Sequence, residues 1–259
     1  MSAPAWLVAT PIAHRGLHDQ NRPENSLAAI EAAVQQGFPV EIDVQTTVDG
    51  SAVVFHDWNL RRLTGLDARV KFTTAADISR LRLAGGPEPV PFLEDVLDLV
   101  QGRQPLIIEI KNRKRPCALE PEVSRILRAY RGPVAVHSFN PFSLGWFRRN
   151  HPGLCRGQIS CSFDTDDMAA WKKIILAHYG MNWMSRPHFI SHHWKQLPAF
   201  VPIILRNFLR LPLLTWTVRN LQEQKIALEC ADNIFFEGYL PCQPLASDSV
   251  ATAKSLSNN

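Results

Sequence analysis

The first quarter of the chain, residues 13–57, constrains the fold more than any other stretch. Three short apolar runs within it each end in polar residues, at His14-Arg15-Gly16, at Glu41-Ile42-Asp43 and at His56-Asp57. Between the first two runs, residues 26–37 have the Ser cap, the apolar spacing and the closing Gly of a helix. A strand–helix–strand unit with such a short return is typical of parallel α/β folds.

This unit directs two carboxylates to one space. In the second run, Glu41 and Asp43 share one face of the strand and the apolar residues share the other. Asp49-Gly50 is a strong hairpin signal, so residues 51–55 should fold back antiparallel to that strand and bring His56 near the carboxylates. We therefore expect a polar cluster where these strands end.

The rest of the chain predicts the fold class. After an excursion at about 58–91, strands and helices alternate, and without the hairpin arm the strands number eight. That count favours a closed (β/α)8 TIM barrel over an open doubly wound sheet. We predict one domain over 1–259, with the insertion and the hairpin arm after the second strand and a loosely ordered tail at 247–259. The predicted parallel strands are 10–13, 39–44, 106–111, 134–139, 154–160, 188–194, 213–218 and 233–237, and the predicted helices after the excursion are 92–100, 120–130, 142–150, 166–179, 197–209 and 221–229.

Composition narrows the possible partners. With 259 residues, 46% of them hydrophobic, and a net charge of +4, the chain resembles ordinary globular proteins and gives no indication of nucleic-acid binding. Five cysteines without a Cys-x-x-Cys motif favour free thiols in a reducing compartment, and no signal peptide is evident, so we predict a cytoplasmic protein. The apolar stretch 197–216 contains Arg206, Arg210 and three prolines, which argues against a membrane span. For residues 197–209 we favour a buried barrel helix over a weak membrane-surface contact.

Carboxylates late in two strands suggest a metal site. Glu41, Asp43 and Glu109 would repel one another at a barrel mouth unless a cation or protons compensated their charge. All-oxygen ligands favour Mg²⁺ or Ca²⁺ over Zn²⁺. The alternative is that Glu109 simply pairs with Lys111, two residues further on the same face.

Two histidines and two cations follow the same strands. His14 and His56 could act as acid and base, because the free imidazole titrates near neutral pH, although a single histidine at a strand end is more often structural. Arg15 and Lys111 could hold a phosphate, or form salt bridges to nearby carboxylates.

Other candidates are weaker. We favour packing or solvent roles for His137 and for His192-His193 over roles in a site. Trp216 could line a pocket or fill the core, and Arg113-Lys114-Arg115 could be a solvated loop or steer an anionic substrate.

Taken together, the motifs resemble the glycerophosphodiester phosphodiesterase family. The resemblance spans nearly the whole chain, and the order and spacing of the N-terminal motifs are highly specific. One departure lies after the last strand, where the family has an Asp followed by Tyr-Pro and this chain has Glu237-Gly238-Tyr239-Leu240-Pro241; we expect it not to affect the catalytic set. The matching motifs are His14-Arg15-Gly16, Pro23-Glu24-Asn25-Ser26, Glu41-Ile42-Asp43-Val44, Thr47-Val48-Asp49-Gly50, Val54-Phe55-His56-Asp57, Leu60-x-Arg62-x-Thr64-Gly65, Glu109-Ile110-Lys111 and Trp216-Thr217-Val218.

The resemblance implies a (β/α)8 barrel with a small insertion and a role for each matched site residue. Glu41, Asp43 and Glu109 would bind one divalent cation, Mg²⁺ or Ca²⁺. His14 and His56 would be the general acid and base, and Arg15 and Lys111 would hold the phosphate.

The implied activity is metal-dependent hydrolysis of a small-molecule glycerophosphodiester to glycerol 3-phosphate and an alcohol such as choline or ethanolamine. The alternative is a lipid-directed phosphodiesterase, of the phospholipase or lysophospholipase type, acting at a membrane surface. A barrel that binds phosphodiesters without turnover is less favoured, because it would lack a catalytic residue and none of the matched set is missing. A sugar-phosphate isomerase is the least favoured, because it would not need three carboxylates and two histidines. The headgroup, the acid and base assignment, the attacking hydroxyl and the oligomeric state stay open.

Overall fold

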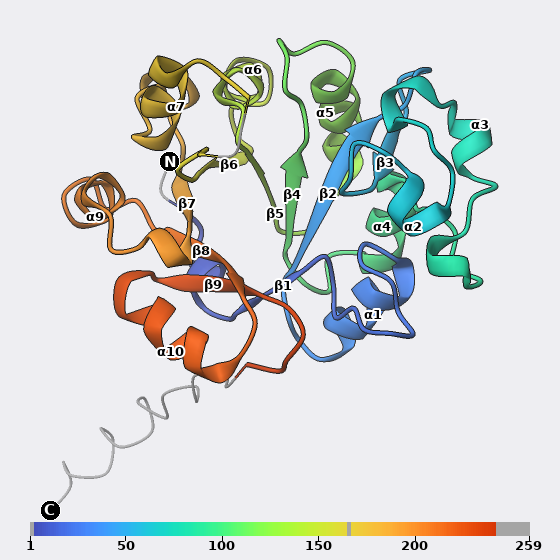
Figure 1. Cartoon of the computed structure of the whole chain (residues 1–259), viewed down its shortest axis with the longest axis horizontal. Helices are drawn as coiled ribbons and strands as arrows, with labels where there is room; N and C mark the ends of the chain where they lie inside the picture. Colours follow the sequence, from blue (N-terminus) through green and yellow to red (C-terminus); the bar gives the residue numbers. More distant parts are fainter. Residues whose placement is uncertain (1–2, 165–166, 242–259) are drawn as a thin grey trace, which may run out of the picture.

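A computed structural model describes residues 3–164 and 167–241, and in this part of the chain a single sheet closes into a barrel (Figure 1). Eight strands run parallel, and the barrel closes because β1 pairs with both β2 and β9. Helices lie around the outside of the strands (Figure 1). The predicted (β/α)8 barrel is therefore confirmed. The strands are β1 (Ile12–His14), β2 (Val40–Thr46), β3 (Ala52–Val54), β4 (Leu106–Ile110), β5 (Val134–Ser138), β6 (Cys155–Ser160), β7 (Phe189–His193), β8 (Leu213–Val218) and β9 (Asn233–Phe236).

The first strand–helix–strand unit forms as predicted. Helix α1 (Leu27–Gln35) begins at Ser26, whose hydroxyl accepts a hydrogen bond from the backbone N–H of Ala29 at 3.1 Å. Gly37, with φ of +81°, reverses the chain after the helix. Strand β2 then pairs in parallel with β1, with His14 opposite Glu41. The register brings the first histidine and the first carboxylate to the same level of the barrel.

The hairpin arm and the excursion after it also form. Strand β3 runs antiparallel to β2. The chain then makes α2 (Arg61–Thr64) and α3 (Ala75–Ile78) before α4 (Leu93–Val100). The excursion has a small apolar core of its own, which includes Leu60, Val70, Ile78, Leu83 and Val90. This core holds the loop after β3 firmly, and that loop contains His56.

The later helices differ from the predictions in three places. The helix predicted at 166–179 is α7 (Ala170–Ala177), and part of its predicted first turn lies outside the described residues, as do Cys242 and the predicted tail 247–259. A short helix, α8 (Asn182–Ser185), was not predicted. The prediction that residues 197–209 form a buried helix is wrong, because α9 (Phe200–Asn207) buries only Pro202 and leaves Phe200 80% exposed. The remaining helices are α5 (Leu119–Ala129), α6 (Pro141–Asn150) and α10 (Leu221–Cys230).

Apolar side chains fill one end of the barrel. They come from six strands and from the 3-10 helix Ala5–Val8, and they include Leu7, Ile12, Ile107, Ala135, Phe189, Leu214 and Phe235. Gly157 on β6 leaves room for this packing, since a Cβ there would lie 2.2 Å from the Phe189 ring. The apolar plug forms a floor, and polar side chains begin directly above it. No helix among the described residues is long and apolar enough to cross a membrane, and no disulfide joins the cysteines in this part of the chain.

Candidate active site

In several strands, an apolar residue of the floor is followed two positions later by a polar residue. Ile107 on β4 is followed by Glu109, and Ala135 on β5 is followed by His137. Alternate residues of a strand point to the same face, so each such pair faces the barrel interior. The same step takes Ile12 to His14 and Phe235 to Glu237. The resulting polar residues line a cavity of about 520 Å³ at the carboxyl ends of the strands, where barrel enzymes have their active sites.

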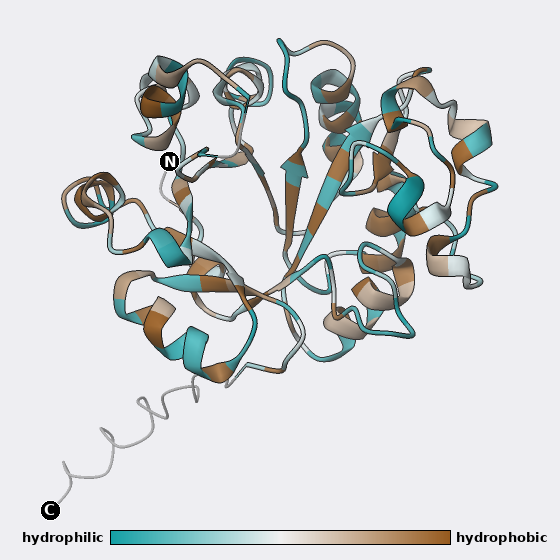
Figure 2. Cartoon of the chain, in the orientation of Figure 1, coloured by the Kyte–Doolittle hydropathy of each residue, from teal (hydrophilic) through white to brown (hydrophobic). Residues whose placement is uncertain are grey.

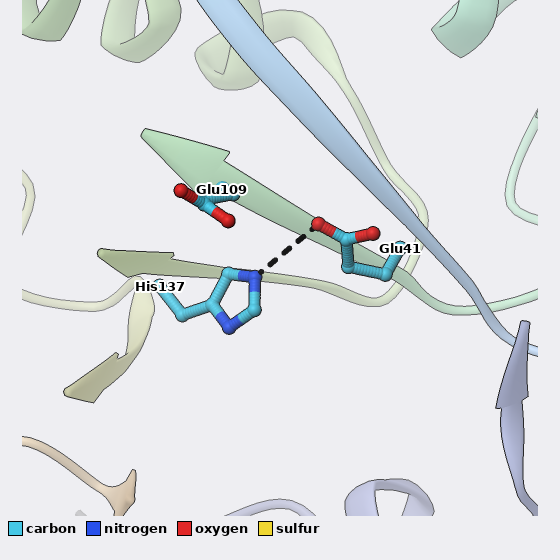
Figure 3. Close-up of side chains that lie close together, drawn as sticks. All are labelled: Glu41, Glu109 and His137. Atoms are coloured by element: carbon cyan, nitrogen blue, oxygen red, sulfur yellow. Dashed lines mark ion pairs between the residues drawn. The ribbon is translucent and has the colours of Figure 1, made fainter. Parts of the chain in front are cut away.

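One acid–histidine cluster could hold a cation. Glu41, Glu109 and His137 each direct one ligand atom into a space where these atoms lie within 4.8 Å of one another (Figure 3). The Nε2 atom of His137 is 3.5 Å from Oε1 of Glu41. His137 is 4% exposed, and neither ring nitrogen has a hydrogen-bond partner among the described residues. Carboxylate oxygens beside an imidazole whose buried nitrogens lack hydrogen bonds fit a divalent cation.

His137 therefore lines the cavity, and it also has the predicted packing role, because its ring stacks on that of Phe235 with the ring centres 5.5 Å apart. The alternation along β5 was the signal that could have identified it, because His137 lies opposite Glu109 in the β4–β5 register. His192, by contrast, is buried against Tyr179, whose hydroxyl lies 3.1 Å from His192 Nδ1, as the packing prediction expected.

Asp43 lies beside the cluster and is surrounded by cations. Its carboxylate is 3.1 Å from Nε of Arg15 and 3.3 Å from Nζ of Lys111, and it accepts a hydrogen bond from Nδ2 of Asn25 at 3.0 Å. Burial raises the pKa of Asp43, but the charges of Lys111 and Arg15 outweigh it and hold the pKa well below its usual range. Asp43 is thus ionised, and in this structure its charge is balanced by side chains.

The two predicted phosphate ligands line the cavity. They also form salt bridges to carboxylates, which was the other predicted role. Arg15 donates to Glu24 at 2.8 Å, and Lys111 lies 3.4 Å from Glu109. Burial lowers the pKa of Lys111, but the charges of Glu109 and Asp43 raise it by more. The pKa of Lys111 therefore lies above its usual value. Both side chains are therefore cations held in place at the cavity wall.

Each predicted catalytic histidine has a carboxylate partner at Nδ1. His14 Nδ1 lies 2.6 Å from Glu237, and His56 Nδ1 lies 2.7 Å from Asp57. A carboxylate at Nδ1 fixes the ring orientation and leaves Nε2 for chemistry. The structure thus brings the two histidines to one cavity in matching arrangements.

Glu237 contradicts the expectation that the departure after the last strand does not affect the catalytic set. Besides His14, it lies 3.7 Å from Nε2 of His18 and 2.7 Å from Nη2 of Arg219. Burial raises the pKa of Glu237, but the hydrogen bond with His14 and the nearby His18 and Arg219 outweigh it, so the pKa lies well below its usual range. Glu237 is an ionised partner of His14, and its acidic character at the place of the family's Asp was the signal for it.

Several other side chains complete the cavity wall. Trp216 lines the cavity, which was one of its two predicted roles. Arg62, which belongs to a matched motif but was given no role, donates to Glu24 and to Asp57. It links the partner of Arg15 to the partner of His56. Arg113, from the predicted basic loop, lies outside this cavity and is placed over Trp58, with its guanidinium 5.1 Å from the ring centre.

The fold and the cavity together define a class of protein. It is a (β/α)8 barrel with an acid–histidine cluster and two cationic side chains at the carboxyl ends of its strands. The model of the glycerophosphoryl diester phosphodiesterase family matches residues 14–231. The chain therefore belongs to the glycerophosphoryl diester phosphodiesterase family, as the motifs predicted.

Individual relatives agree with this assignment. A glycerophosphodiester phosphodiesterase of Bacillus altitudinis is 34% identical over 154 residues, which are 55% of this chain and 62% of that protein. Glycerophosphodiester phosphodiesterase 1 of Bos taurus is 43% identical over 223 residues, which are 81% of this chain and 60% of that protein. The chain thus spans less than two thirds of the length of these relatives.

A solved structure is similar along most of both chains. A phosphodiesterase of Oleispira antarctica, solved in complex with the product sn-glycerol-3-phosphate, superposes with a TM-score of 0.68 at 25% identity. The similarity covers 87% of this chain and 91% of that chain.

Proposed function

We propose that this protein is a metal-dependent phosphoric diester hydrolase that cleaves glycerophosphodiesters to glycerol 3-phosphate and an alcohol. The observation that supports this most strongly is the convergence of two carboxylate-held histidines on one cavity that also contains an acid–histidine cluster. The family and the names of the relatives support the substrate class. They give no support to the lipid-directed alternative.

The cation site comprises Glu41, Glu109 and His137, and we keep Asp43 as a further candidate ligand, as the family resemblance implies. A bound Mg²⁺ or Ca²⁺ would supply Lewis-acid polarisation of the phosphoryl oxygens and neutralise part of their charge. Two of the three donors in the cluster are carboxylates, which suit a hard cation.

Arg15 and Lys111 bind the phosphate and stabilise the charge that develops on it in the transition state. Both are cations fixed by carboxylates before substrate arrives, so little reorganisation is needed. Charge-assisted hydrogen bonds of this kind orient a phosphate within the cavity.

His14 and His56 transfer protons. One accepts the proton of the attacking hydroxyl, and the other donates a proton to the departing alkoxide oxygen as the P–O bond breaks. Glu237 and Asp57 hold the Nδ1 atoms, so each ring presents Nε2 for proton transfer. In each turnover, one imidazole therefore takes up a proton and the other gives one up.

The direct test is release of glycerol 3-phosphate from glycerophosphocholine by the purified protein, with EDTA and then with Mg²⁺ or Ca²⁺ restored. We expect release that EDTA abolishes and the cation restores. His14→Ala and His56→Ala should each fold and lose at least about a hundredfold in turnover. Absence of release with any cation, from a folded protein offered several glycerophosphodiesters, would refute the proposed activity.

A further inference from the structure

Helix α9 is apolar on two opposite faces. On the inner face, Val201 and Leu205 pack with buried residues of β7 and β8. On the outer face, Phe200, Ile204 and Phe208 lie at four-residue spacing, and Phe200 and Phe208 are each 80% exposed. A helix that is apolar all round is normally buried or in contact with a membrane. The outer face of α9 thus lacks the polar surface of an ordinary barrel helix.

The neighbouring helices repeat this pattern. On α7, Trp171 and Ile174 are 61% and 62% exposed, and on α8 Trp183 is 72% exposed. Helices α7 and α9 lie on the same flank of the barrel, and both show apolar segments there (Figures 1 and 2). Tyr179, in the turn after α7, packs in the same cluster as the inner face of α9. The exposed residues of α7 and α9 therefore form one aromatic and aliphatic flank, whereas α8 is joined to α6 by a hydrogen bond from Arg148 to the carbonyl of Trp183.

The segment that contains this flank has only cationic charged residues, although Arg206 is ion-paired with Asp232 and Arg219 with Glu237 at the cavity. Residues 168–222 contain no Asp or Glu and seven Lys or Arg, whereas the chain as a whole has a net charge of only +4. The rest of the chain is therefore net negative, and positive charge is concentrated where the aromatic residues are exposed. Two exposed lysines stack beside tryptophans, with Lys172 over Trp171 and Lys195 over Trp194, each at 5.5 Å.

We propose that the outer face of α7 and α9 docks the protein on the surface of an anionic phospholipid bilayer. Tryptophan and phenylalanine favour the interface between headgroups and acyl chains, and lysine and arginine are attracted to anionic headgroups. The docking proposal does not depend on the proposed hydrolysis, and no lipid is taken as the substrate.

A bilayer fits this flank better than a second copy of the chain. In a two-fold symmetric dimer the same patch faces itself, so the concentrated positive charges would meet like charges. An anionic surface offers opposite charge over the whole flank.

The test is cosedimentation of the full chain with vesicles of phosphatidylcholine alone and with equimolar phosphatidylglycerol. We expect binding to the anionic vesicles that falls as salt is raised, and little binding to the neutral ones. The double variant Trp171→Ala/Phe208→Ala should bind at least about tenfold more weakly, because two side chains no longer leave water. Lys172→Gln/Arg210→Gln should weaken binding and reduce its salt dependence.

Phe72→Ala is the matched control. Phe72 is 68% exposed in the excursion after β3, and Lys71 lies over its ring at 4.6 Å, so it resembles Trp171 in exposure and in its cationic neighbour. This variant should bind as the unaltered chain does. Thermal unfolding and hydrolysis of soluble glycerophosphocholine should be unchanged in all three variants, since none of the residues lines the cavity.

Absence of binding to anionic vesicles at low salt would overturn the proposal. So would equal losses in the control and in the double variant. If the chain self-associates and Trp171→Ala/Phe208→Ala abolishes that association without affecting vesicle binding, the flank is an interface between copies and the membrane proposal is wrong.

Discussion

Replacing Glu237 by Gln tests whether the carboxylate after the last strand orients a catalytic histidine. The side chains of His14 and Glu237 are 13% and 16% exposed, and the Nδ1–Oε2 distance is 2.6 Å. The substitution keeps the shape of the side chain and removes its charge. A hydrogen bond to a charged group contributes about 1.5–3 kcal/mol, so its loss in the transition state corresponds to a fall of roughly 10- to 150-fold in kcat.

The assay is the initial rate of glycerol 3-phosphate release from glycerophosphocholine over a range of substrate concentrations. We expect kcat to fall while KM stays within about twofold, because Glu237 contacts His14 rather than the phosphate ligands. Glu237→Asp, which restores the family's residue, should retain more activity than Glu237→Gln. Glu31→Gln is the matched control, since Glu31 is ion-paired with Arg103 away from the cavity. Full kcat in Glu237→Gln, or a loss no larger than in the control, would refute the orienting role.

Three further predictions concern the cation, the backbone and pH. Glu41→Ala and His137→Gln should each raise the cation concentration needed for half-maximal activity, and unchanged metal titrations would contradict their ligand roles. Gly16→Ala should lower the free energy of unfolding by about 1–3 kcal/mol more than Gly37→Ala, because both have φ of +81° but only at Gly16 would a Cβ meet backbone, at 2.6 Å; equal losses in denaturant titrations would contradict this. Burial lowers the pKa of His192 from 6.5 to about 4, so it is neutral when folded and gains a proton on unfolding. The free energy of unfolding should therefore fall as pH drops from 6.5 to 4, by up to about 3 kcal/mol, and His192→Gln should flatten that fall.

The barrel could be predicted from the sequence because apolar residues recur at a different spacing in its strands than in its helices. Alternation in β2 directed Glu41 and Asp43 to one face, and the helix cap at Ser26 marked where α1 begins. These are local properties of the chain, and tertiary packing did not override them. Parallel pairing then required the remaining strands to follow in order around the barrel.

The partners of the site residues were harder to predict because they come from distant parts of the chain. Glu237 and His14 are separated by 223 positions, and only closure of the barrel between β1 and β9 brings them together. For His137 a packing or solvent role was favoured because it was considered alone. In register with Glu109 and two residues above the apolar floor, it occupies a position equivalent to those of the other site residues.

The error at α9 shows what apolar periodicity does not specify. Val201 and Leu205 predict a helix with a buried face, and that face packs, partly buried, against residues of β7 and β8. Phe200 and Phe208 lie on the opposite face, and their hydrophobicity says only that this face gains from leaving water. The described residues do not cover this face. The anionic bilayer that we propose would cover it, and the absence of acidic residues between 168 and 222 agrees with the charge of that surface.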